Sequence, residues 1–167
     1  MKGSAHIIVA IASRQRTKKI NRDLLRRVIA ALLAELEIAN AELGVCLVGS
    51  KEMARVNRQF LQHEGSTDVI TFDHRDVDRG AKHPAGPLHG ELFICVDDAV
   101  KQAEEFGTSW RSEIVRYAVH GVLHLLGHDD LKPDPRRKMK RAENRLVRRL
   151  EKSFPLSELE LPPPAKS

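Results

Sequence analysis

Residues 114–130 read IVRYAVHGVLHLLGHDD and contain the most informative pattern of the chain. Its apolar residues continue to Leu126 and predict a buried central helix that Gly127 ends. His120 and His124 stand four positions apart near the end of that helix, so both imidazoles leave the same helix face. This stretch therefore predicts a core helix with a polar site at its C-terminal end.

The residues of this polar site have the composition of a metal centre. Two histidines at i and i+4 can hold one ion, and Gly127 lets the chain turn back so that a later residue reaches the same face. Nitrogen and carboxylate ligands suit zinc, which at catalytic sites takes three protein ligands and keeps a water in the fourth position. We predict one Zn2+ ion held by His120, His124 and Asp130, with His128 as the alternative third ligand.

The residue after the first histidine argues against a zinc peptidase. Peptidases with two zinc histidines at this spacing carry a Glu there as general base, whereas this chain has Gly121. Activation of water then rests on the metal or on another carboxylate, so we predict catalytic roles for His120, His124 and Asp129. A metal site without that Glu, in a basic protein, favours hydrolysis of a phosphodiester.

The basic residues are concentrated near the two ends of the chain. The 167 residues include 28 Lys and Arg against 23 Asp and Glu, a net charge of +5. Residues 14–27 hold seven basic residues and one acidic residue, and residues 132–152 hold ten and three, so the two segments carry +6 and +7 and leave −8 on the rest. This pattern favours an anionic partner, although charge runs are more often solvated helix faces.

The remaining sequence alternates between strand and helix patterns. Runs of β-branched and apolar residues predict strands at residues 6–12, 44–50, 69–72 and 90–96. Apolar spacing of three and four predicts a helix after each strand except the third, including residues 51–61 with Met53, Val56 and Phe60 inward. Pro133 and Pro135 are expected to separate the central helix from a last helix at about 136–152.

This order of elements predicts one small α/β (mixed α+β) domain over residues 1–152, with a mixed sheet of about four strands, packed helices and the metal site at the end of a central helix. Residues 153–167 are expected to form a disordered C-terminal tail. Cys46 and Cys95 lie in apolar runs, which predicts core residues, no disulfide framework and a cytoplasmic location. No apolar run approaches the roughly 18–20 residues of a membrane-spanning helix, so we expect no membrane partner.

The histidine motif resembles the signature of a known family. HGVLHLLGHDD is similar to the H-G-x-L-H-L-x-G-[YH]-D-H motif of the YbeY endoribonucleases, the ribosomal RNA maturation factors. The resemblance covers roughly residues 6–152 and includes residues 57–72, residues 90–107 and the pair Met139 and Glu143. It implies a zinc-dependent endoribonuclease specific for single strands, which matures the 3′ end of small-subunit ribosomal RNA and serves ribosome quality control. The implied partners are ribosomal RNA, the small ribosomal subunit and a ribosome-associated protein.

Two positions depart from the family pattern. The first two zinc histidines of the family fall on His120 and His124, but the third falls on Asp130, which adds a negative charge beside the phosphate site. The catalytic arginine of the family falls on Leu61, which cannot contact phosphate. Arg58, one helical turn earlier, is a candidate replacement.

The same reasoning predicts four RNA-binding residues, Arg58, Arg136, Arg137 and Lys138. Aromatic residues make up only 4% of the chain, so we expect RNA to be held by its phosphates rather than by stacked bases. Two other functions stay open. Leu61 in place of the family arginine favours a non-catalytic ribosome-assembly factor that binds RNA and has a structural metal, and a zinc peptidase is the second alternative, against which Gly121 argues.

Overall fold

The computed structural model of the chain describes residues 4–61, 65, 67–75 and 86–165, and within these ranges it contains one four-stranded sheet. The strands are β1 (His6–Arg14), β2 (Asn40–Val48), β3 (Val69–Asp73) and β4 (Leu88–Cys95), in the spatial order β1-β2-β4-β3. β1, β2 and β4 run parallel, whereas β3 pairs with β4 antiparallel at the edge. The predicted mixed α/β domain with a mixed four-stranded sheet is confirmed.

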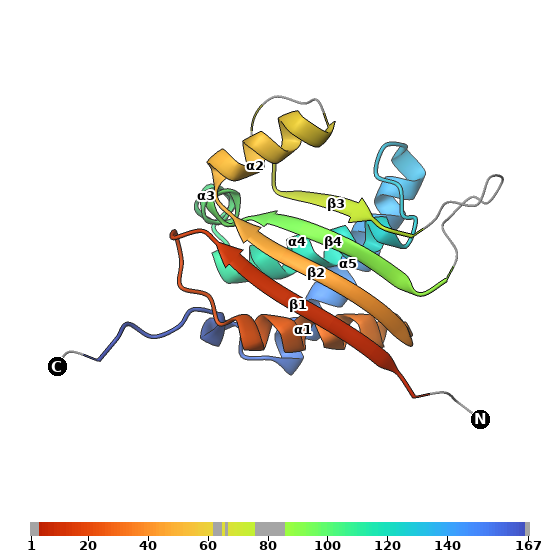
Figure 1. Cartoon of the computed structure of the whole chain (residues 1–167), viewed down its shortest axis with the longest axis horizontal. Coiled ribbons are helices and arrows are strands. Elements are labelled where there is room, and N and C mark those ends of the chain that lie inside the picture. Colours follow the sequence, from red (N-terminus) through yellow and green to blue (C-terminus); the bar gives the residue numbers. More distant parts are fainter. Residues whose placement is uncertain (1–3, 62–64, 66, 76–85, 166–167) are drawn as a thin grey trace.

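Helices cover one face of this sheet (Figure 1). α1 (Arg22–Glu35) packs on β1, and α4 (Trp110–Leu125) packs on β3 and β4. α5 (Pro133–Ser153) lies against both α1 and α4, and α3 (Val96–Phe106) lies beside α4. α4 is therefore the central helix, buried between the sheet and the helices around it. None of the described helices has the length and apolar character needed to cross a membrane.

Alternation along the strands produces two separate apolar clusters. The larger lies under α1 and α4, and its strand residues include Val9, Leu43, Val45, Leu47, Leu92 and Ile94. A smaller cluster lies on the opposite face, where α2 (Ser50–Val56) places Met53 and Val56 against Cys46 and Cys95. Both cysteines are buried core residues, as predicted.

The helix predicted at residues 51–61 is interrupted. α2 ends at Val56 and continues as a π-helical turn, Asn57–Leu61, which rotates the following side chains relative to the α2 stripe. Asn57 is buried there and its Nδ2 donates to the Gly65 carbonyl at 2.9 Å. Phe60, predicted to point inward, is instead 58% exposed, and its ring meets Phe72 edge to face with the centroids 5.5 Å apart.

The last helix begins earlier than predicted. Pro133 and Pro135 lie inside the first turn of α5 rather than before it. Proline is tolerated there because the amides of the first helical turn have no partner within the helix and the ring presets a helical φ. α5 therefore begins three residues closer to the end of α4 and carries Arg136 beside His120 and Asp130. The three predicted metal ligands, His120, His124 and Asp130, are called the metal cluster below.

Residues 154–161, which follow α5, are part of the folded domain, so the prediction of a disordered tail from residue 153 does not hold there. Leu159, in a short 3-10 turn at Leu156–Leu159, is only 1% exposed. The Asn21 amide donates to the Leu159 carbonyl at 2.7 Å, and the Leu161 amide donates to the Lys19 carbonyl at 2.9 Å. This segment pins the start of α1.

Leu159→Ala tests this docking. We expect it to lower the free energy of unfolding by about 2–4 kcal/mol, because it leaves a cavity in a closed apolar site. Leu161→Ala is the matched control, because Leu161 is 42% exposed, and it should change stability by about 0.5 kcal/mol or less. Denaturant unfolding of both variants measures the difference, and equal small effects would mean that the segment contributes nothing to the fold.

Candidate metal centre

The two motif histidines come from the last turns of α4. Ser109 caps the start of the helix by accepting from the Arg111 amide at 3.2 Å, and apolar residues on most sides hold the helix in the core. His120 and His124 lie on one face of it, with side chains 29% and 28% exposed. The helix thus presents two imidazoles at the border between core and solvent.

Gly121, between these histidines, faces the sheet. A Cβ atom at this position would lie 2.8 Å from Leu92 Cδ2 and 3.3 Å from Thr71 Cγ2. The Leu92 side chain, which is fully buried, would have to shift to admit a side chain here. The general-base Glu of the zinc peptidases would meet this contact, so packing as well as chemistry argues against that alternative.

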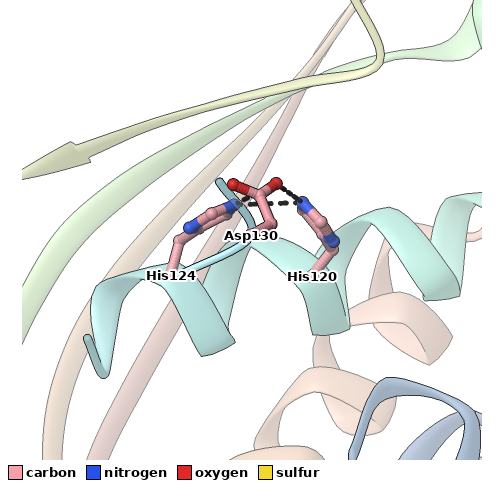
Figure 2. A group of neighbouring side chains, drawn as sticks. All are labelled: His120, His124 and Asp130. Carbon is pink, nitrogen blue, oxygen red and sulfur yellow. Dashed lines mark hydrogen bonds and ion pairs between the residues drawn. The ribbon is translucent and has the colours of Figure 1, made fainter. Parts of the chain in front are cut away.

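Asp130 returns to the same helix face after a reversal of the chain. Gly127 has a φ of 95°, and the His128 amide donates to the Leu123 carbonyl at 3.0 Å. Figure 2 shows the result: Asp130 Oδ2 lies 3.5 Å from His120 Nε2 and 3.3 Å from His124 Nε2. The two Nε2 atoms are 3.1 Å apart.

The outer ring nitrogens of both histidines are engaged elsewhere. His120 Nδ1 lies 3.2 Å from Glu143 Oε1, and His124 Nδ1 lies 3.1 Å from the His128 carbonyl oxygen. A carboxylate and a carbonyl can only accept, so each Nδ1 carries the proton. Both Nε2 atoms face Asp130 Oδ2, and in the neutral form of each ring Nε2 carries the lone pair, so three potential ligand atoms face one point.

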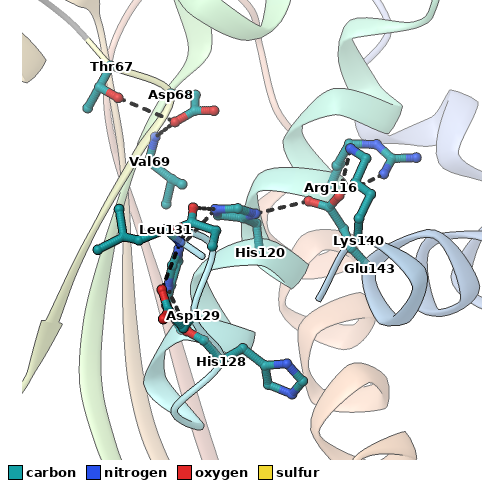
Figure 3. A network of polar contacts seen from close by, with 12 residues as sticks. Thr67, Asp68, Val69, Arg116, His120, His128, Asp129, Leu131, Lys140 and Glu143 are labelled. Atoms are coloured by element: carbon teal, nitrogen blue, oxygen red, sulfur yellow. Dashed lines mark hydrogen bonds and ion pairs between the residues drawn. The ribbon is translucent and has the colours of Figure 1, made fainter. Parts of the chain in front are cut away.

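This donor set fits a divalent metal ion. Three ligand atoms, one each from His120, His124 and Asp130, lie within 4.8 Å of one another. Two imidazole nitrogens and one carboxylate oxygen with further positions open suit a catalytic transition-metal site. The geometry favours Asp130 over His128 as the third ligand, since the His128 ring points away from the cluster and only its carbonyl contacts His124 (Figure 3).

Glu143 orients the first histidine and is itself held by two cations. Its carboxylate, 5% exposed, accepts from Arg116 Nη1 at 3.1 Å and lies 2.9 Å from Lys140 Nζ (Figure 3). Burial raises the pKa of Glu143, but the hydrogen bonds from His120 and Lys140 outweigh burial and lower that pKa to about 2. In turn the hydrogen bond to Glu143 raises the pKa of His120.

The role of Glu143 in this network was not predicted, although the sequence contains a signal for it. It is an acidic residue in the buried stripe of an otherwise basic amphipathic helix, in register with Met139, Leu146 and Leu150. A carboxylate in that position requires partners. Asp68, just before β3, is a second acidic residue near the site that was not predicted from the sequence. Its Oδ1 accepts from the Val69 amide at 2.7 Å, and it lines the cavity beside the metal cluster.

Two cavities flank the loop that follows α4. The smaller, about 290 Å³, contains His120 and Asp130 together with Asp68 and Arg136. The larger, about 710 Å³, is lined by Gly127–Asp129 on one side and by the start of α5 on the other, including Arg137 and Lys138. Three of the four predicted RNA-binding residues therefore line cavities next to the metal cluster.

The remaining predicted site residues lie apart from the cluster. Asp129 lines the larger cavity, and its Oδ1 accepts from the Leu131 amide at 2.7 Å. Arg58 is exposed on the π-helical turn. Leu61 is 43% exposed and offers only an apolar side chain.

The two candidates for the third ligand can be separated by substitution. We expect Asp130→Ala to weaken zinc binding by at least about tenfold, because it removes a ligand oxygen. His128→Ala is the matched control and should bind zinc like the parent, because alanine keeps the carbonyl that contacts His124. Zinc content after dialysis and competition titration measure both, and the reverse ranking would assign the third ligand to His128.

A second prediction concerns acid stability. The folded-state pKa of Glu143 lies below its ordinary value of 4.5, so its stabilisation is present above about pH 4.5 and is lost as the pH falls toward about 2. Glu143→Gln should lower the free energy of unfolding of the metal-free protein by about 1–3 kcal/mol at neutral pH and flatten its decline over that interval.

The matched control for this prediction is Glu151→Gln, on the exposed side of the same helix, which should keep the pH dependence of the parent. Urea unfolding at a series of pH values in the presence of a chelator provides the measurement. An unchanged slope in Glu143→Gln would show that Glu143 has an ordinary pKa.

The chain was compared with known families and structures. The family model described as endoribonuclease YbeY matches residues 10–151. A relative from Geobacter metallireducens with that name is 38% identical over 121 residues, 72% of this chain and 79% of the relative. One from Myxococcus xanthus is also 38% identical, over 117 residues, which are 70% of this chain but only 39% of that longer protein.

A solved structure supports the fold separately. The solution structure of a Thermotoga maritima protein superposes with a TM-score of 0.62 and 24% identity, over 90% of this chain and 95% of that one. The family match extends from β1 into α5 and includes every residue of the metal cluster. The chain belongs to the endoribonuclease YbeY family.

Proposed function

We propose that the protein is a zinc-dependent endoribonuclease that cuts single-stranded ribosomal RNA, matures the 3′ end of the small-subunit RNA and takes part in ribosome quality control. The observation that carries the proposal is the convergence of His120 Nε2, His124 Nε2 and Asp130 Oδ2 beside a cavity with basic residues. The family match adds the class of reaction. The small ribosomal subunit and a ribosome-associated protein are the proposed partners, and the cytoplasm the proposed location.

The residues around the ion would have distinct tasks. A bound zinc ion would polarise the scissile phosphate and lower the pKa of its water. Glu143 and the His128 carbonyl keep both Nδ1 atoms protonated, so that the Nε2 lone pairs remain available. Arg136, in the smaller cavity with His120, is positioned to hold a phosphate oxygen. Asp129 stays a proposed proton acceptor, reached from the larger cavity.

One observation favours a second candidate function. Leu61 occupies the position of the family arginine, and neither it nor the exposed Arg58 belongs to the residues that line the two cavities. A protein without that arginine can bind RNA through its phosphates and use the metal only to hold the loop after α4. This alternative is an RNA-binding assembly factor that cuts no strand.

Cleavage of a single-stranded fragment of small-subunit ribosomal RNA by the purified protein tests the proposal. We expect shortened products on a denaturing gel, loss of cleavage with a chelator and recovery with zinc. His124→Ala should reduce the rate by at least about 100-fold, because it removes a metal ligand. His89→Ala, at an exposed histidine on β4, is the matched control and should keep the rate.

The outcomes separate the candidates. Full cleavage by a His124→Ala protein treated with chelator would overturn the metal-dependent nuclease. RNA that binds with a salt-dependent affinity but keeps its length at every metal concentration would select the assembly factor.

A further inference from the structure

We propose that the solvent face of α5 is a track for RNA phosphates that leads away from the metal centre; the nature of its polyanion rests on the proposed function. Five exposed residues, here called the basic stripe, form this track: Lys138, Arg141, Arg145, Arg148 and Lys152. They repeat at three and four residues, so they lie along one side of the helix. The stripe extends over about 21 Å, since a helix rises about 1.5 Å per residue.

The stripe lies opposite the face that α5 buries in the core. The buried positions of this helix, which also recur at three and four, are Met139, Glu143, Leu146, Val147 and Leu150. Packing against α1 and α4 therefore fixes the rotation of the helix and directs the basic stripe toward solvent. The orientation of the stripe follows from burial and needs no partner to maintain it.

The charges of the stripe are uncompensated. Ion pairs occur at its margins, where Arg137 contacts Asp134 and Arg149 Nη1 lies 2.5 Å from Glu35 Oε2. Within the described ranges, no acidic side chain lies within ion-pair distance of a stripe residue. Like charges at these helical spacings destabilise a helix, by about 0.2–0.5 kcal/mol for each pair. A polyanion bound along the stripe removes this repulsion.

Two exposed arginines of α1, unlike the stripe residues of α5, have an acidic partner on their own helix. They are Arg26 and Arg27, which contact the same carboxylate, that of Asp23. The basic charge of α1 is thus partly neutralised within its own surface, whereas that of α5 is open along its length.

The stripe also has a defined starting point. Lys138 and Arg141 line the larger cavity, whose opposite wall is Gly127–Asp129, the loop between the histidines and Asp130. An RNA strand with its scissile phosphate at the metal cluster can therefore place the next phosphates in this cavity and the following ones along Arg145 and Arg148. The stripe thus begins at the larger cavity, which shares the loop after α4 with the smaller cavity that His120 and Asp130 line.

The shape of the stripe favours RNA over an anionic membrane. A helix that binds a lipid surface inserts an apolar face between the headgroups. The apolar face of α5 is occupied by α1 and α4, so it is not available for insertion. A narrow row of long basic side chains matches the spaced charges of a nucleic-acid backbone.

The test compares RNAs of different length. The triple variant Arg141→Gln, Arg145→Gln, Arg148→Gln of the full chain is matched with Arg22→Gln, Arg26→Gln, Arg27→Gln, which removes the same charge from the exposed side of α1. Dissociation constants are measured at several salt concentrations for a single-stranded RNA of about four nucleotides and one of about thirty, with chelator present. A denaturing gel verifies that the RNA stays intact.

For the parent, we expect the long RNA to bind much more tightly than the short one. In the α5 variant the slope of log K against log salt for the long RNA should fall by about 2, about 0.7 for each lost contact, and affinity should drop at least about tenfold. The α1 variant should keep the parent slope. Thermal unfolding of both variants controls for folding.

An α5 variant with the parent slope, or an α1 variant that loses as much, would overturn the track. Binding to anionic phospholipid vesicles is measured for the parent and for both variants. If only the α5 variant loses vesicle binding and its RNA binding is unchanged, the stripe is a membrane-binding surface and the RNA track is overturned. The proposed nuclease is judged separately. If the parent protein binds long RNA through α5 but never cuts it, the track is supported and the proposed nuclease is overturned. If the parent cuts RNA but the α5 variant keeps the parent salt slope, the nuclease is supported and the track is overturned.

Discussion

The structure depends most on how two imidazole rings are oriented at the end of α4. Glu143 and the His128 carbonyl each hold one Nδ1 proton, and this directs both Nε2 lone pairs toward Asp130 Oδ2. With both rings neutral, three ligand atoms converge on one point, where a cation would bridge them. The helix, the reversal at Gly127 and the buried carboxylate together create this arrangement of candidate ligands.

Glu143 connects this centre to the basic helix. Its position in the buried stripe of α5 lets it contact His120, and Arg116 and Lys140 compensate the charge that burial would otherwise make costly. The contact that orients a candidate metal ligand is thus also one that fixes the rotation of α5. Because that rotation directs the uncompensated arginines of the opposite face to solvent, the candidate chemistry and the candidate RNA surface share one structural cause.

Local sequence patterns predicted most of the strands and helices and the three candidate metal ligands. The i and i+4 spacing placed His120 and His124 on one face, and Gly127 predicted the reversal that brings Asp130 back, because helix geometry and a positive φ are local properties. The order of strands and helices was equally readable from periodicity. The basic segment at residues 132–152 was visible, but only the buried face of α5 tells which of its charges stay open.

What the sequence did not yield depends on tertiary contacts. The contact between Glu143 and His120 joins α5 to α4 across 23 residues of sequence. Its only local signal is an acidic residue within an apolar stripe. The π-helical turn that exposes Phe60 and the docking of Leu159 beside α1 also arise from long-range packing. The composition of residues 153–167 predicted a disordered tail because it is rich in proline and polar residues. It does not show that one leucine, Leu159, is buried beside α1.

A crystal structure of the zinc-loaded protein, with anomalous scattering at the zinc edge, shows which atoms hold the ion. We expect one ion bound by Nε2 of His120, Nε2 of His124 and a carboxylate oxygen of Asp130, at about 2.0–2.2 Å, with both Nδ1 atoms still on Glu143 and the His128 carbonyl. An ion bound through either Nδ1 or through the His128 ring, with Asp130 turned away, would rule out this ligand set.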